Sequence, residues 1–218
     1  MKRTCLVAVL LLVGQRDLSA QWNLARVQPG DARMHISMAV DPAVITSVGY
    51  GRFTTLFGAT TSLGFEVGVV AGDAELGDYR VRLGGEVQLV RRGAFRVAAS
   101  AAFMTRGTSN WVFRAVNFGS DFGATAGVYR RGWFVAGEVG FDKAIITHLK
   151  HTQEYRDQYY GAKDGWYLNN GGTGRLGIIT GRAVGGAELL LRAGIARTQG
   201  GEALAVPAYL TIGLGFGF

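Results

Sequence analysis

Ten charged side chains stand at alternate positions of otherwise apolar stretches. Arg80, Arg82 and Glu86, for example, share one face of residues 79–89, because successive side chains of a β-strand point to opposite sides. The set contains five acids and five bases, namely Glu66, Arg80, Arg82, Glu86, Arg96, Glu138, Asp142, Arg175, Glu188 and Arg192. If these residues face the inside of a small barrel, they pair across its lumen and plug it. The alternative is a narrow or gated pore for small polar solutes, with selectivity set by the fixed charges.

Two histidines and a glutamate lie close together in the sequence. His148, His151 and Glu154 are residue types that bind metal ions. Zinc needs several ligands held in one geometry, whereas this spacing falls where a strand runs into a loop, with no third histidine nearby. We therefore expect no metal and no cofactor. We expect the histidines to hydrogen-bond loop backbone or to contact lipid phosphate.

Hydrolytic or acyl-transfer chemistry would need a serine or carboxylate that a histidine activates. Residues of these types near the expected outer ends of strands are Ser109, Ser120, Asp121, His148 and His151. No local motif singles any of them out. We therefore expect no catalytic residue, and a lipid-modifying enzyme (a hydrolase or acyltransferase) or a protease is only the third reading of this chain.

The segment from Thr147 to Gly171 combines aromatic and charged side chains. Its aromatic residues are Tyr155, Tyr159, Tyr160, Trp166 and Tyr167. Loops of this length are uncommon in compact domains and usually carry function, and this aromatic content is not typical of disorder. We expect the loop to fold over one mouth of the barrel, either as a surface-recognition patch or only to seal the lumen.

Period-two alternation dominates the chain, so strands must position these residues. Tight turns at 91–93, 130–132 and 184–186 alternate with longer connections at 71–78, 105–117, 147–171 and 197–202. This rhythm is typical of up-and-down transmembrane barrels, and no apolar run is long enough for a transmembrane helix. Ten strands are predicted, near 33–41, 44–52, 58–70, 78–90, 94–105, 118–130, 132–146, 174–183, 186–197 and 203–218. A barrel of eight strands, without the first two, is the alternative.

Alternation alone does not show whether the polar face of the strands lines the interior or covers the exterior. A soluble lipocalin-like barrel, with its polar face outside, is therefore the structural alternative. The polar faces here are rich in Gly, Ser, Thr and Ala, which suits a narrow interior. Aromatic residues near the ends of the apolar faces would form girdles at two membrane interfaces. These are Phe53, Phe57, Tyr79, Phe95, Phe103, Trp133 and Phe141.

The N-terminus has the order of a secretory signal peptide. Lys2 and Arg3 precede an apolar run at 5–14 and a polar stretch that ends at Ala20, where we expect cleavage. Cys5 would leave with the signal, so the mature chain would have no thiol and no disulfide. Its net charge would fall from +7 to +5, with 20 basic and 15 acidic residues, and nucleic acid is not an expected partner.

The last residues carry the most specific signal. Thr211, Gly213, Phe216 and Phe218 resemble the C-terminal β-signal of bacterial outer-membrane β-barrel proteins, a superfamily that includes the small OmpX/OmpA-like barrels. The resemblance implies recognition by the barrel-assembly machinery and a place in the outer membrane of a Gram-negative-type envelope. It implies no particular activity and identifies no narrower family.

The prediction is therefore an all-β, transmembrane, antiparallel up-and-down β-barrel at 33–218. It would follow a signal peptide at 1–20 and a short N-terminal periplasmic segment at 21–32. We expect a plugged lumen, a structural or surface-interaction role, and contact with outer-membrane lipid and lipopolysaccharide. A porin-like pore is the second reading. An extracellular ligand has no signature in these residues.

Overall fold

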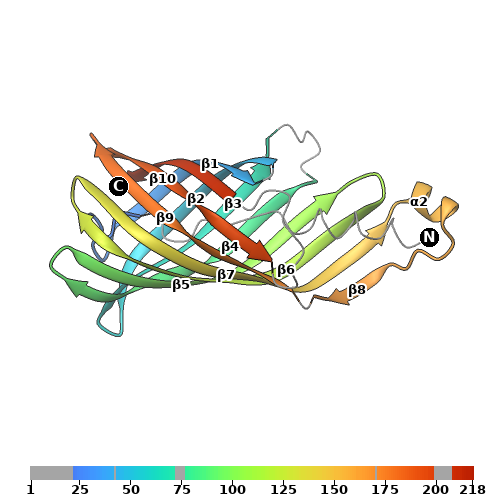
Figure 1. Ribbon diagram of the computed structural model, residues 1–218, viewed down its shortest axis with the longest axis horizontal. Coiled ribbons are helices and arrows are strands. Elements are labelled where there is room, and N and C mark those ends of the chain that lie inside the picture. Colours follow the sequence, from blue (N-terminus) through green and yellow to red (C-terminus); the bar gives the residue numbers. More distant parts are fainter. Residues whose placement is uncertain (1–21, 42, 72–76, 170, 199–207) are drawn as a thin grey trace.

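The computed structural model describes residues 22–41, 43–71, 77–169, 171–198 and 208–218. It is an elongated antiparallel barrel, with the C-terminus at the end that carries the tight turns (Figure 1). The elements are β1 (Ala32–Asp41), β2 (Ala43–Leu56), β3 (Ala59–Val70), β4 (Tyr79–Arg92), β5 (Phe95–Ser109), β6 (Phe113–Arg130), β7 (Trp133–His151), α2 (Gln153–Gln158), β8 (Gly165–Leu168), β9 (Gly172–Val184), β10 (Ala187–Thr198) and β11 (Ala208–Gly217). Within these ranges, no helix has the length and apolar character needed to cross a membrane.

The first and last strands of the ring close the barrel. β1 pairs with β11 from Arg33↔Gly217 to Val40↔Leu210, and Ala32 exchanges two backbone hydrogen bonds with Phe218. The remaining neighbours follow in chain order, apart from β8, which pairs with β7 beyond the ring. The prediction of ten strands in a closed antiparallel barrel is therefore confirmed. Closure pairs the strand edges that an open sheet would leave exposed.

The strands on the long-loop side extend further than the sequence predicted. The expected loop at 105–117 is wrong, because β5 continues to Ser109, β6 starts at Phe113, and Ser109 faces Arg114 across the ladder. Asn110 closes the short turn by accepting from the backbone N–H groups of Val112 and Phe113, both at 2.9 Å. Gly, Thr and Ser at 107–109 have the composition of a turn, but pairing with β6 determines their conformation.

The predicted loop at 147–171 also contains regular structure. β7 runs on to His151, α2 begins after the N-cap Thr152, and β8 returns to pair Gly165–Leu168 with β7. Together with the ends of β5 and β6, these elements form a projection beyond the ring, defined here as residues 107–118 and 145–168. Its described part extends along the barrel axis (Figure 1) rather than across the opening, so the expected fold over the mouth is wrong.

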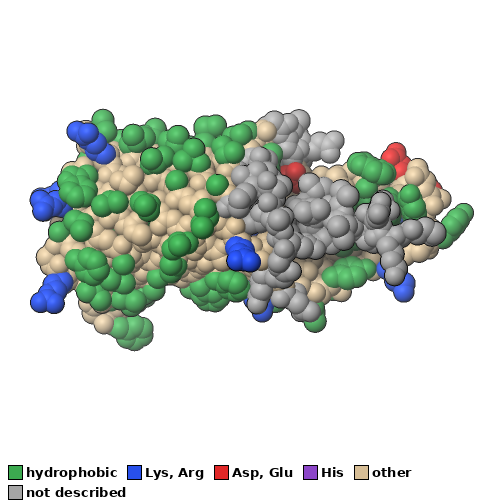
Figure 2. Space-filling view, viewed as in Figure 1, with side chains coloured by type: hydrophobic (Ala, Val, Ile, Leu, Met, Phe, Trp, Pro, Cys, Tyr) green, Lys and Arg blue, Asp and Glu red, His purple; other side chains and the backbone are tan. Residues whose placement is uncertain are grey.

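The barrel is apolar outside and polar inside. Leu83, Ile178, Ile195 and Ile212 are among many exposed aliphatic residues of the wall. On the opposite face of the same strands, charged residues such as Arg82, Arg175 and Arg192 are buried. Hydrophobic side chains spread over the wall, and Lys and Arg side chains stand at the tight-turn end (Figure 2). This arrangement is the reverse of a soluble lipocalin-like barrel and suits a wall in contact with lipid.

One member of the predicted aromatic girdle is misplaced. Phe53 is 2% exposed and lies inside the barrel, because the inward positions of β2 are the odd-numbered ones. Its ring packs edge-on against Trp22 at 6.3 Å. Phe95, Phe103, Trp133 and Phe141, also predicted for the girdle, do face outward.

The described N-terminal segment enters the barrel at its tight-turn end. Trp22, Asn23 and Leu24 are buried, and Leu24 belongs to an apolar cluster with Tyr129, Phe134 and other interior residues. This segment falls within the predicted periplasmic stretch at 21–32, and it narrows the mouth from within. The predicted signal peptide, its cleavage site and Cys5 lie outside the described residues.

Candidate functional site

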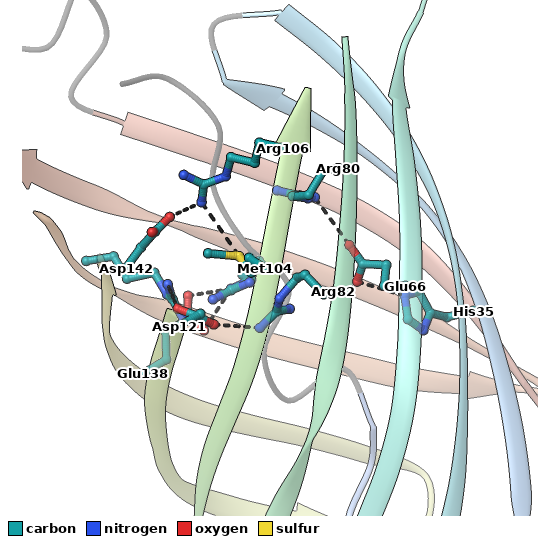
Figure 3. A network of polar contacts seen from close by, with 11 residues as sticks. His35, Glu66, Arg80, Arg82, Met104, Arg106, Asp121, Glu138 and Asp142 are labelled. Carbon is teal, nitrogen blue, oxygen red and sulfur yellow. Dashed lines mark hydrogen bonds and ion pairs between the residues drawn. The ribbon is translucent and has the colours of Figure 1, made fainter. Parts of the chain in front are cut away.

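The centre of the lumen holds one carboxylate between two guanidinium groups. Asp121 on β6 is 1% exposed, and it accepts from Arg82 on β4 at 2.5 Å. Arg175 on β9 donates to both oxygens of the same carboxylate, at 2.6 and 3.1 Å. Figure 3 shows Arg82 reaching across the interior to Asp121. A buried charge needs such a partner, because leaving one member of an ion pair unpaired costs about 3–5 kcal/mol.

A second group of interior charges joins three later strands. Glu138 on β7 accepts from Nε of Arg192 on β10, at 2.6 and 2.7 Å. The hydroxyl of Tyr209 on β11 donates to the same carboxylate at 2.5 Å. The Arg192 guanidinium also lies 5.6 Å from the centre of the Tyr209 ring. These contacts join β11, the closing strand, to β7, three strands away around the ring.

A third group lies across the first strands. Glu66 on β3 accepts from Arg80 on β4 at 3.2 Å, and it meets Nε2 of His35 on β1 at 3.3 Å. Asp142 on β7 pairs with Arg106 on β5. Both sets lie in the network drawn in Figure 3. Ion pairs therefore connect strands around much of the ring, and the sequence-based prediction of buried salt bridges in the interior is confirmed.

Three of the ten predicted lumen charges form no side-chain ion pair among the described residues. Glu188 accepts from the backbone N–H of Asn23 at 3.2 Å, so the N-terminal segment supplies its hydrogen bond. Arg96 donates to Gln88 at 3.3 Å. Glu86 receives no salt bridge from the described residues, and its Oε1 has no hydrogen-bond partner among them. All three side chains are buried, so the interior combines paired and unpaired charge.

A small cavity adjoins the unpaired carboxylate. It measures about 90 Å³ and is lined by Glu86, Ser62, Ser100, Trp22 and other interior residues. A buried water needs roughly 10–15 Å³ of such volume, so the cavity has room for a few water molecules but for no larger solute.

Glycine makes room for the largest interior groups. Gly140 on β7 lies opposite Arg175, and a side-chain carbon there would overlap the guanidinium. Gly49 on β2 lies opposite His35, and a side-chain carbon there would overlap the imidazole ring. A glycine beside a long charged residue thus allows a narrow barrel to hold many ion pairs.

Several interior residues were absent from the sequence-based prediction. His35, Arg106, Tyr209 and the N-terminal Asn23 were not assigned to the lumen. Asp121 was placed near the outer rim, and that placement is wrong, because β6 begins earlier and brings Asp121 to the centre. His35 and Tyr209 could have been predicted from the sequence, because the alternation within 33–41 and 208–217 places both on the polar face of their strands.

The projection is organised around aromatic rings and one carboxylate. Tyr155 stacks on His151 at 5.2 Å and on Tyr159 at 4.7 Å. Asp164 accepts from the backbone N–H of His151 at 2.8 Å and meets Nδ1 of its ring at 2.9 Å. These two hydrogen bonds hold the pKa of the Asp164 carboxyl below its usual value. These contacts join β7, α2 and the residue that precedes β8.

The remaining candidates in this segment are spread over its surface. Tyr160, Trp166 and Tyr167 are exposed, and Trp166 packs against His148 at 4.7 Å. No cluster of three or more metal-binding side chains occurs among the described residues. Glu154 lies in the first turn of α2.

At the tight-turn end, the β-signal residues occupy the closing strand. Thr211 and Gly213 point into the barrel, whereas Phe218 is exposed and stacks on Tyr50 of β2 at 6.5 Å. The two faces of β11 therefore divide as the alternation requires.

Comparisons with known proteins give no family. No protein-family model matches the chain, and no curated protein matches it. The β-domain of the Bordetella autotransporter BrkA aligns with 85% of this chain and 97% of its own, at 14% identity and a TM-score of 0.36. A porin aligns with 94% of this chain and 66% of its own, at 15% identity and a TM-score of 0.36. The barrel itself is established by the strand pairing of this chain.

Proposed function

We propose that this chain is a bacterial outer-membrane barrel with a closed lumen, exported with a cleaved signal peptide, whose projection binds lipopolysaccharide. Its role is non-catalytic. The apolar wall, the interior ion pairs and the resemblance of its last strand to the β-signal support the membrane location and the closed lumen. In this orientation the tight turns face the periplasm and the projection stands outside the cell.

The observation that carries the proposal is a pair of cations on the projection. Arg114 on β6 lies directly opposite Lys150 on β7, and both are exposed. Neither forms a salt bridge with a carboxylate among the described residues. Like charges opposite each other destabilise a strand pair, so an anion that contacts both would relieve their repulsion.

Aromatic rings lead from the barrel wall to these cations. Phe103 stacks on Phe118 at 6.2 Å, and Phe118 stacks on Trp166 at 6.1 Å. His148, which packs on Trp166, lies two residues before Lys150 and so on the same face of β7. Rings at the lipid boundary followed by cations beyond it match the sugars and phosphates of lipopolysaccharide.

The binding test compares two exposed arginines near the same end of the barrel. Lipopolysaccharide is titrated into the full chain in neutral detergent, with affinity measured by calorimetry. We expect Arg114→Gln to weaken binding about tenfold, because one charge-assisted hydrogen bond is lost. Arg197→Gln, which removes the same charge from the exposed end of β10, serves as the control. Equal losses in the two variants would contradict a specific site at Arg114.

The closed lumen has a separate test. We expect no stable conductance when the full chain is inserted into a planar lipid bilayer, because ion pairs fill the interior. A stable conductance that shifts in Arg82→Gln or Glu86→Gln would establish the pore reading instead, since both residues line the lumen cavity.

A further inference from the structure

A β-bulge turns an arginine toward the inside of the barrel at its tight-turn end. The register between β4 and β5 shifts between Gln88 and Val90, and both Leu89 and Val90 are exposed. Arg91 consequently lies opposite Arg96, whose side chain is buried in the interior. Without the extra residue, Arg91 would share the outward face of Leu89. Bulges re-aim side chains in this way next to functional sites.

The arginine that Arg91 meets has no acidic partner in the described part of the chain. Arg96 is 6% exposed, donates to the neutral Gln88 at 3.3 Å, and has an Nε with no hydrogen-bond partner there. Two like charges face each other at Arg91 and Arg96 in a partly desolvated mouth, which is unfavourable without a counter-charge.

A pocket opens at the same place. It has a volume of about 620 Å³ and lies between residues 24–29 of the N-terminal segment and the tight turns. Arg91, Arg96, Arg130 and Arg131 all line it, and its described lining contains no Asp or Glu. The Arg130 guanidinium, by contrast, lies 5.9 Å from the centre of the outward-facing Trp133 ring, so its charge is on the outer wall. Arg91 and Arg96, which share the inward face, and Arg131 therefore give the pocket a positive lining, and no carboxylate balances it among the described residues.

We propose that this pocket is a binding site for a phosphate group. Guanidinium forks match phosphate oxygens in pairs, and a group with two negative charges would neutralise the Arg91–Arg96 repulsion. The phosphate belongs either to the headgroup of an anionic lipid in the adjacent leaflet or to a soluble molecule. The bulge at Leu89 is the device that assembles the site, since it brings Arg91 to the lumen side.

The experiment uses inorganic pyrophosphate as the probe and the full chain in neutral detergent. Binding is followed by calorimetry at constant ionic strength. We expect Arg91→Gln and Arg96→Gln each to weaken binding at least about tenfold. Arg92→Gln is the matched control, because Arg92 is the exposed neighbour that does not line the pocket, and it should change the affinity less than about twofold. Arg197→Gln, at the far end of the barrel, should behave as Arg92→Gln does.

The outcomes separate the possibilities. Absence of pyrophosphate binding, or an equal loss in Arg91→Gln and Arg92→Gln, would overturn the site. Arg91 is exposed, so its variant remains informative even if Arg96→Gln does not fold. Nanodiscs then distinguish the sources: weaker pyrophosphate binding in phosphatidylglycerol than in phosphatidylcholine supports a lipid headgroup, and equal binding supports a soluble phosphate.

Discussion

The middle of the lumen and its tight-turn mouth use arginine in opposite ways. At the middle, Arg82 and Arg175 both bond to Asp121. At the mouth, Arg91 and Arg96 face each other, and no carboxylate lines their pocket among the described residues. The first arrangement satisfies its own charges and connects strands. The second leaves positive charge that an anion from outside the chain can neutralise. Arginine is therefore structural at the middle and available for binding at the mouth.

The largest effect should follow from removing the shared carboxylate. Asp121→Asn keeps the shape of the side chain and removes the charge that two buried guanidinium groups share. We expect the free energy of unfolding to fall by about 3–5 kcal/mol. Urea unfolding of the folded barrel in lipid vesicles measures this. A loss below about 1 kcal/mol, the range of exposed ion pairs, would show that the central network adds little to stability.

The mouth should respond differently to a comparable change. Arg96→Gln removes a buried cation that has no acidic partner in the described chain, so no broken ion pair is left behind. We expect its stability, without added phosphate, to equal or exceed that of the unmodified chain. The same urea experiment, run beside Asp121→Asn, gives the comparison. A loss as large as that of Asp121→Asn would mean that Arg96 is structural and would remove the contrast between the two regions.

The exposed projection should show the smallest effect. The pKa of Asp164 is lowered in the folded state. The stabilisation that its ionised carboxylate gives to the projection is therefore fully present above the usual pKa of 3.8, and it is lost as the pH falls through the lowered pKa. We expect Asp164→Asn to speed hydrogen exchange at the His151 amide near neutral pH, with the difference fading below that value. Global stability should barely change. Asp157→Asn, on α2 of the same segment, is the control; an equal effect there would exclude a specific role for the Asp164–His151 contact.

Local alternation predicted much of this architecture. Arg80, Arg82 and Glu86 could be placed inside because the period of a strand is two, whatever its partners are. The ten strands followed from the turns between such segments. Strand ends were less readable, since residues 107–109 have turn composition, yet they pair with β6. For the same reason Asp121 was expected at a rim and lies at the centre.

The candidate sites were less predictable than the barrel. Nothing local shows that Arg91 turns inward, because a bulge is a mismatch between two strands and exists only once they pair. The position of Trp22 and Asn23 inside the mouth also depends on walls contributed by distant residues, such as Glu188.

By itself, the sequence determined the alternating segments, the inward set of ten charges and the closing strand that ends at Phe218, because these depend on the alternation and turns within each segment. It favoured ten strands and left eight as the alternative. Only the tertiary structure decided which of those charges meet. In the folded barrel, Arg82 and Arg175 both donate hydrogen bonds to Asp121, and Arg91 lies opposite Arg96. The physical reason is that pairing depends on strand register, and register is a property of two strands held in one closed ring.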